Sequence, residues 1–212
     1  AKLLRQNILQ QAIEGKLTID WRKQNPVQKG NPDYDAEALF EQIQKERNSE
    51  KKQKELSSIT DEEKPFEIPE GWKWVRLGEI SESCLGKMLD SAKNQGEKRK
   101  YLRNLNVRWF SFDLSDVLEM KIKDDELNRC SARKGDLLIC EGGYPGRSAI
   151  WNEDYDICFQ KAVHRVRFYG LPNMPRLFNL FLFGCFSNTN FFSVIIQLYC
   201  RLIFFGHYFL RY

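Results

Sequence analysis

Residue types that build metal sites are sparse in this sequence. There are only two His residues, and the six Cys residues, at positions 84, 130, 140, 158, 185 and 200, include no C-x-x-C pair. Zinc sites need closely spaced thiolate and imidazole ligands. We therefore expect no metal and no cofactor. Because the N-terminus does not resemble a secretory signal, we expect a cytoplasmic protein with free thiols.

Charged residues are nearly missing from the C-terminal segment. Residues 170–212 contain three Arg but no Lys, Asp or Glu, and they hold nine of the 15 Phe residues. A membrane-spanning helix needs about 18 or more apolar residues, whereas Gln197, Arg201 and His207 interrupt the best window. We predict a buried helix from Leu177 to Phe186 and interpret residues 191–212 as an aberrant or out-of-frame tail.

Enzyme motifs are absent or fragmentary. The loop Gly142-Gly143-Tyr144-Pro145-Gly146 lacks the Gly-Lys-Ser/Thr of a nucleotide-binding P-loop, and no Asn-Pro-Pro-Phe/Tyr methyltransferase signature occurs. The residue types of a restriction-type nuclease occur only in Pro32-Asp33 and Glu119-x-Lys121, which lie far apart. A metal-dependent nuclease stays as one alternative, and a helical interaction adaptor without DNA affinity as another.

What is present fits a folded protein with an appendage. The chain has 212 residues, 42% of them hydrophobic and 29% charged, with a formal net charge of +4. Such a composition is typical of a globular domain. The mildly basic balance permits nucleic-acid binding without arguing for it.

The first 65 residues predict a helical arm. Leu4, Ile8 and Ala12 are spaced as one helix face, and Gly15 suits the end of that helix. So short a helix needs a partner: it either docks on its own domain or is the end of a longer coiled-coil helix. We interpret residues 21–33 and 57–64 as linkers, and residues 36–56 as a second helix whose charge run faces solvent.

The run from Ile68 to Ile80 predicts the entrance to a globular domain. Pro69-Glu70-Gly71 is typical of a turn, and Trp72 and Trp74 alternate with Lys73 as in a strand. A short helix can begin at Glu79. Beyond this run, short β-rich segments predict strands at residues 101–103, 117–122, 136–140, 147–151 and 158–168, with one helical turn at residues 124–127. The fold class is therefore α+β.

Candidate DNA contacts gather in residues 98–108. Cations neutralise phosphates, Arg forks onto guanine, and Asn onto adenine. In a strand, Arg103 would share a face with Tyr101, and Asn104 with Asn106. Backbone N–H groups of the glycine loop could approach a phosphate. The candidate DNA-binding residues are Lys98, Arg99, Lys100, Tyr101, Arg103, Asn104, Asn106, Arg108, Tyr144, Arg147, Lys161 and Arg165.

Each of these features also has a simpler explanation. Residues 98–108 would then be a solvated edge strand, and the glycine loop a plain hairpin connection. The cations of residues 161–167 would pair with the acids of residues 153–156. His164 is more typical of a core or edge histidine than of a catalyst.

Three stretches together resemble the DNA specificity subunits of type I restriction-modification systems. The first runs from Leu4 to Leu17 and is similar to the end of their long conserved helix. The second is the run from Ile68 to Ile80, which looks like the entrance to a target-recognition domain. The third combines Gly135-Asp136-Leu137-Leu138-Ile139 with Gly146-Arg147 and Phe159-Gln160. The resemblance covers about residues 3–186.

The resemblance implies a non-catalytic subunit that reads double-stranded DNA. It implies an α+β, mixed-sheet target-recognition domain at residues 66–190, entered through the arm of residues 1–65. Partners would be the methyltransferase subunit, through it the restriction subunit, and a second copy through the N-terminal helix. No membrane is expected. Family members usually carry two recognition domains and two long helices. This chain departs from that pattern, because it has one such domain and the end of one helix, so we expect a truncated subunit.

Overall fold

The chain folds into two compact units. The computed structural model describes residues 2–50, 56–64, 66–186 and 203–205. One unit is Glu82–Phe186, and the other combines Ala1–Ser81 with Ser187–Tyr212. The tail predicted at residues 191–212 lies outside the described residues, except for residues 203–205. Among the described helices, none is long and apolar enough to cross a membrane.

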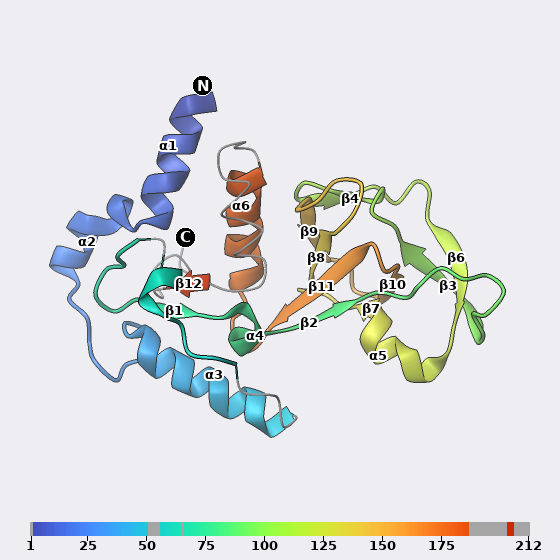
Figure 1. The fold of residues 1–212 in the computed structure, drawn as a ribbon, viewed down its shortest axis with the longest axis horizontal. Coiled ribbons are helices and arrows are strands. Elements are labelled where there is room, and N and C mark those ends of the chain that lie inside the picture. The colour runs from blue at the N-terminus through green and yellow to red at the C-terminus, as the bar shows by residue number, and fades with distance from the viewer. Residues whose placement is uncertain (1, 51–55, 65, 187–202, 206–212) are drawn as a thin grey trace. The chain divides into compact units, whose positions relative to one another are not determined.

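Helices dominate the described part of the first unit (Figure 1). They are α1 (Lys2–Ile13), η1 (Lys16–Thr18), α2 (Ile19–Gln24), α3 (Ala36–Glu50), η2 (Asp61–Glu63) and α4 (Leu77–Ile80). The strand β1 (Lys73–Val75) pairs antiparallel with β12 (Ile203–Phe205). The predicted N-terminal helix, the turn before Trp72 and the strand that contains Trp74 are thereby confirmed.

Gly15 connects two of the stretches on which the resemblance depends. Its φ of 71° is left-handed, which suits the residue that follows a helix. A Cβ at this position would lie only 2.7 Å from Pro69 and 2.9 Å from Trp72. The end of α1 therefore packs directly on the turn that precedes β1. The linker predicted from Trp21 is wrong in its first part, since α2 extends to Gln24 and the Arg22 guanidinium lies over the Trp72 ring, 5.7 Å from its centroid.

Arg76 fastens the linker of residues 57–63 to β1 and α4. Its side chain is buried and donates to Ser57 O at 2.7 Å and to Ser58 O at 3.1 Å. It also forms an ion pair of 3.0 Å with Glu63. Through these contacts, the segment predicted as a linker is part of the packed unit.

The second unit contains two four-stranded sheets and one small hairpin. The first sheet has the order β6-β3-β10-β7 and the second β2-β11-β8-β9, while β4 and β5 form the hairpin. The strands are β2 (Ser81–Leu85), β3 (Glu97–Leu102), β4 (Val107–Arg108), β5 (Ser111–Phe112), β6 (Leu118–Ile122), β7 (Ser131–Ala132), β8 (Leu137–Cys140), β9 (Ser148–Ile150), β10 (Ile157–Phe159) and β11 (Val163–Phe168). The helices are η3 (Asp124–Glu126), α5 (Leu127–Cys130) and α6 (Met174–Phe186).

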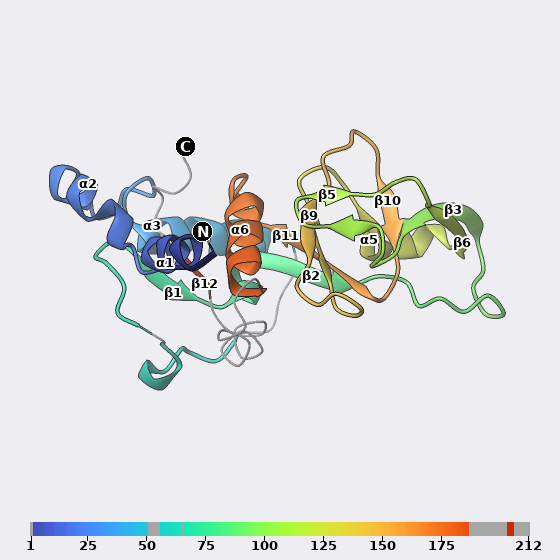
Figure 2. The same cartoon turned by 90° about the horizontal axis from the view of Figure 1, so that it is seen from above.

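The first sheet is mixed, which confirms the predicted fold class. Strands β3 and β10 run parallel, whereas β3 and β6 are antiparallel (Figures 1 and 2). One face of this sheet buries Tyr101, Met120, Ile122 and Cys158, and Leu127 of α5 packs against them. The other face contributes to the larger core, whose buried members are Leu102, Val107, Ala132, Leu138, Cys140, Ala149, Trp151, Ile157, Phe159 and Val163.

The Gly135-Asp136 pair has a structural explanation. Gly135 has a φ of 93°, so the chain turns there into the fully buried strand β8. The buried carboxylate of Asp136 accepts a hydrogen bond from the backbone N–H of Arg133 at 2.8 Å. It also accepts two from the guanidinium of Arg167, at 2.7 and 2.6 Å. This motif therefore holds a turn and the strand β11 together.

Two strand predictions need correction. The strand predicted to reach Arg103 ends at Leu102, and residues 104–106 form a turn. The strand predicted at residues 158–168 is interrupted after Phe159, where residues 161–162 turn before β11 begins. Each break is closed by a local backbone hydrogen bond, from Asn106 N–H to Arg103 O at 3.0 Å in the first turn and from Val163 N–H to Gln160 O at 2.9 Å in the second.

Candidate nucleic-acid interface

The turn after β3 is built around the side chain of Asn106. Its Oδ1 accepts from the backbone N–H of Arg103 at 2.8 Å, and its Nδ2 donates to Asp113 O and Asp116 O at 2.9 and 3.0 Å. The residue is buried. An amide with these three bonds has little left to offer a base edge. Asn106 therefore shapes the loop of residues 103–116 and is not placed to read adenine.

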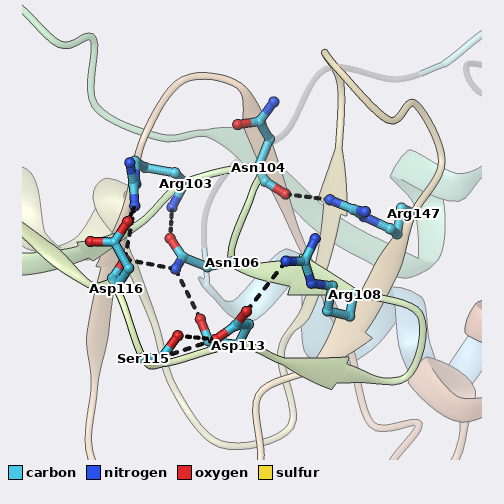
Figure 3. A network of polar contacts seen from close by, with 8 residues as sticks. All are labelled: Arg103, Asn104, Asn106, Arg108, Asp113, Ser115, Asp116 and Arg147. Carbon is cyan, nitrogen blue, oxygen red and sulfur yellow. Dashed lines mark hydrogen bonds and ion pairs between the residues drawn. The ribbon is translucent and has the colours of Figure 1, made fainter.

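Two arginines of this loop are paired with acids of the same loop (Figure 3). Arg103 donates to the carboxylate of Asp116 at 2.5 Å and to its backbone oxygen at 2.8 Å. Arg108 lies 3.3 Å from Asp113, and both side chains are exposed. Because exposed ion pairs are weak, Arg108 stays able to exchange Asp113 for a phosphate or a base edge.

Asn104 joins the turn to the glycine loop of residues 141–147. Its Nδ2 donates to Gly142 O at 2.9 Å, and its backbone oxygen accepts from the Arg147 guanidinium at 2.9 Å. Gly143 has a φ of 76°, and a Cβ there would lie 2.4 Å from the Asn104 Nδ2. These contacts bring together two loops that are distant in the sequence. We call residues 103–106 with residues 141–147 the two-loop face.

The two-loop face presents a cation and apolar groups to solvent. The guanidinium of Arg147 stacks over the Tyr144 ring, 3.8 Å from its centroid, and Tyr144 is 52% exposed. Leu105 is also exposed. An aromatic ring that carries a stacked arginine offers both a flat surface and a positive charge, which suits contact with a nucleic acid.

Three exposed lysines share one face of the β3–β6 pair with Glu119, which faces Lys100. Lys98 faces Lys121 directly across the two strands, and Lys100 follows two residues after Lys98 on the same side. All three side chains are exposed, and none forms an ion pair within the described part of the chain. Like charges that face each other across a strand pair are destabilising. We call Lys98, Lys100 and Lys121 the lysine row.

Of the remaining candidate residues, Tyr101, Arg99 and Arg165 are buried or paired with acids of the protein. Tyr101 is only 2% exposed and lies in the smaller core. Arg99 pairs with Glu97 at 3.1 Å and Asp124 at 2.6 Å. Arg165 is 1% exposed and donates to Asn128 O, Ser131 O and the Glu82 carboxylate. Lys161 is exposed.

The alternative in which Arg165 and Arg167 pair with the acids of residues 153–156 is wrong. Arg165 pairs with Glu82, Arg167 with Asp136, and Asp154 with Lys134. Sequence reasoning also missed Lys121 and the aromatic pair Trp109-Phe110. For Lys121 the available signal was the alternation of charged and apolar residues in the predicted strand of residues 117–122.

The described residues contain no group of three His, Cys, Asp or Glu side chains placed to hold a metal ion. Glu119 and Lys121 of the fragmentary nuclease motif are both exposed on β6. His164 lies 3.7 Å from Glu141, and burial lowers the pKa of its imidazole. Burial likewise raises the pKa of the Cys140 thiol beside the two-loop face, so this thiol is a poor nucleophile at neutral pH.

Comparison with known proteins gives two sequence relatives. Over 123 residues, or 55% of this chain, the sequence is 37% identical to the specificity subunit of the type I restriction enzyme EcoAI from Escherichia coli. Over 83 residues, or 36% of the chain, it is 41% identical to the EcoEI specificity subunit from the same organism. This chain is similar in sequence to the specificity subunits of these two type I restriction enzymes. The matches span 19% and 12% of those two proteins, and no protein-family model matches the chain.

Two solved structures are also similar to this chain. The match with the HsdS subunit from Thermoanaerobacter tengcongensis covers 67% of this chain and 35% of that subunit, with a TM-score of 0.48 and 18% sequence identity. A second structure comes from a study of complex assembly and conformational transition in the type I restriction-modification system. The match covers 67% of this chain and 36% of the other, with a TM-score of 0.47 and 16% sequence identity.

Proposed function

We propose that this chain recognises a specific sequence in double-stranded DNA, as the specificity subunit of a type I restriction-modification complex, and that it does no chemistry itself. The observation that carries this proposal is the sequence relationship to the EcoAI and EcoEI specificity subunits. Methylation and cleavage would belong to partner subunits. Residues 66–190 would form the target-recognition domain, and residues 1–65 the helical arm.

The two-loop face suits a role in reading bases. Loops carry binding residues that a rigid scaffold positions, and the hydrogen bonds of Asn104 hold these two loops in one arrangement. Arg147 of this face and Arg108, which lies just beyond it, supply guanidinium groups, which fork onto guanine in the major groove. Tyr144 supplies an exposed ring. A target sequence would then be read mainly by residues 104–108 and 144–147.

The lysine row suits contact with phosphates. Repulsion between Lys98 and Lys121 is unfavourable in the free protein and is relieved when an anion lies between them. Phosphates of a duplex provide such anions, and they fix the position of the protein without reading sequence. Lys161 is a further exposed cation of the same unit.

The partners of the proposed complex are the methyltransferase subunit and, through it, the restriction subunit. α1 is the surface that we propose for docking, because Leu4 and Ile8 lie on one side of this helix and are 65% and 47% exposed. A helix of 12 residues with uncovered leucine and isoleucine gains stability from an apolar partner. Self-association of two copies through α1 is the alternative.

Titration of the purified chain with labelled duplex DNA at several salt concentrations tests the proposal. Affinity should fall steeply with salt, with a logarithmic slope of about −0.9 for each phosphate contact. Absence of binding at low salt would contradict the proposal. An adaptor without DNA affinity would instead bind the methyltransferase subunit through residues 1–65 alone, and a nuclease would cut the duplex when Mg²⁺ is added.

A further inference from the structure

The tip of the β4–β5 hairpin has an unusual backbone. Trp109 and Phe110 form the two-residue connection between Arg108 and Ser111, which face each other in the register. Phe110 has a φ of 65° and is the one residue other than glycine with a positive φ among those that the structure describes. A bulky side chain disfavours this region, where glycine or asparagine is usual. Such strain is found preferentially at functional sites.

The tip is held firmly although it is strained. The backbone N–H of Phe110 donates to Ser148 O on β9 at 3.0 Å. Its ring lies 5.1 Å from that of Phe183 on α6, in an edge-on arrangement. Trp109 packs against the same ring of Phe183, also at 5.1 Å. Phe110 nevertheless remains 45% exposed, so the hairpin presents a fixed aromatic edge to solvent.

This edge adjoins the two-loop face. Ser148, which accepts the hydrogen bond from Phe110, directly follows Arg147. Arg108 is the residue before Trp109. The backbone of Gly146 lies close to Phe186 at the end of α6, since a Cβ there would lie 2.1 Å from that ring. Hairpin tip, glycine loop and α6 therefore form one continuous region of the second unit.

Positive charges outnumber negative ones in this region, where Glu141 is the one acid of the glycine loop. Residues 104–112, 142–152 and 157–186 contribute its loops and helix, and none of these three segments contains Asp or Glu. They do contain Arg108, Arg147 and Arg176. Asp113, which lies just beyond the first segment, contacts Arg108 at 3.3 Å with both side chains exposed. Such a surface favours a polyanion over an acid-rich protein partner.

We propose that Phe110 inserts against the bases of the bound duplex, at a step that is easily unstacked, while Arg108 and Arg147 contact the edges of neighbouring bases. This proposal rests on the DNA-binding function proposed above. Apolar wedges of this kind partly separate neighbouring base pairs and bend the duplex. Flexible pyrimidine–purine steps or mismatches reduce the cost of that deformation. Phe110 is thus assigned as a residue that reads deformability as well as sequence.

The substitution Phe110→Gly tests the proposal with the full chain. Glycine adopts the left-handed backbone without strain, which offsets the lost contact with Phe183, so the melting temperature should change little. Affinity for a matched duplex should nevertheless fall about tenfold, as expected from the loss of one stacking contact. The unaltered chain should bind a duplex with one central mismatch more tightly than the matched duplex, and Phe110→Gly should lose that preference.

Two further variants serve as controls. Phe110→Asn keeps a residue that tolerates a positive φ, and it should behave as Phe110→Gly does. Tyr155→Ala removes an aromatic side chain of comparable exposure, 53%, outside the proposed contact. It should leave the preference for the mismatch unchanged.

Three results would overturn the assignment. The first is equal DNA binding by Phe110→Gly and the unaltered chain, which would leave the DNA-binding function intact. The second is a normal DNA affinity of this variant together with lost binding of the methyltransferase subunit, which would make the tip a protein contact. The third is failure of the unaltered chain to bind any duplex, which would remove the proposed function and the role of Phe110 together.

Discussion

The Nδ2 of Asn104 donates a hydrogen bond of 2.9 Å to Gly142 O, and the Arg147 guanidinium donates one of the same length to the Asn104 backbone oxygen. This reciprocal connection fixes the glycine loop against the turn that follows β3. The candidate DNA contacts on the two loops thus share one geometry, and a change at Asn104 alters both.

Asn104→Ala should therefore weaken DNA binding more than it weakens the fold. We expect a loss of about 1 kcal/mol in the free energy of unfolding, as is usual for one hydrogen bond. DNA affinity should fall more than fivefold, because the glycine loop that carries Tyr144 and Arg147 loses its side-chain bond from Asn104 to Gly142 O and is then held only by the bond from Arg147 to the backbone oxygen of residue 104. Denaturant unfolding and fluorescence anisotropy measure the two quantities. Asn94→Ala is the matched control, since Asn94 donates to Met88 O at 3.1 Å in another exposed loop. Equal affinity of both variants would contradict the coupling.

Removal of one charge from the lysine row should weaken DNA binding without weakening the fold. In Lys98→Gln the repulsion with Lys121 disappears, so the free energy of unfolding should stay constant or rise by a few tenths of a kcal/mol, on the order of a cross-strand pair. The slope of affinity against salt should become less steep by about 0.9. Lys134→Gln removes a lysine that is paired with Asp154 and should leave the slope unchanged. An unchanged slope in Lys98→Gln would exclude Lys98 from phosphate contact.

Arg165 should prove to be a structural residue. Its guanidinium is 1% exposed and donates to two carbonyl oxygens at the end of α5 and to Glu82. Arg165→Met leaves those acceptors without a donor and should lower the free energy of unfolding by about 3 kcal/mol. Its DNA affinity, measured at a temperature where the protein is folded, should stay within about twofold. A folded variant with strongly reduced affinity would return Arg165 to the DNA-binding residues.

The stability of the second unit should fall in alkali because of Cys158. Burial raises the pKa of this thiol to about 11, whereas an unfolded cysteine titrates near ~8.5. The stabilising contribution is complete below the unfolded pKa, and it is lost as pH rises through this window because only the unfolded chain releases the proton. Chemical unfolding at pH 8 and pH 10 should show a larger loss for the unaltered chain than for Cys158→Ala. Equal losses would show that Cys158 does not ionise differently in the two states.

Local periodicity was sufficient to predict the elements whose pattern is strong. The apolar spacing of Leu4 and Ile8, the left-handed Gly15 and the run Leu137-Leu138-Ile139 each led to the element that the structure shows. In these places propensity, pattern and capping agree with the fold. The class α+β followed from the same signals.

The candidate site was harder to predict, because its geometry depends on contacts between distant residues. Asn106 is of a residue type that can read bases, but its side-chain amide donates to the backbone oxygens of Asp113 and Asp116. Arg165 was predicted to contact DNA, but the sheet places it beside the end of α5. The sequence did not indicate a role for Phe110, because its positive φ and its contact with Phe183 arise only in the folded hairpin. Which cations remain unpaired is likewise a property of the folded chain.

The most direct test of sequence-specific recognition is selection of bound duplexes from a random pool. The unaltered chain should enrich one short motif over successive rounds, and Asn104→Ala and Arg108→Ala should reduce that enrichment even at protein concentrations that restore binding. Base contacts distinguish sequences by about 1–3 kcal/mol each, which is ample for enrichment. Binding that stays uniform over the pool after several rounds would contradict a specificity function and leave only electrostatic attachment to DNA.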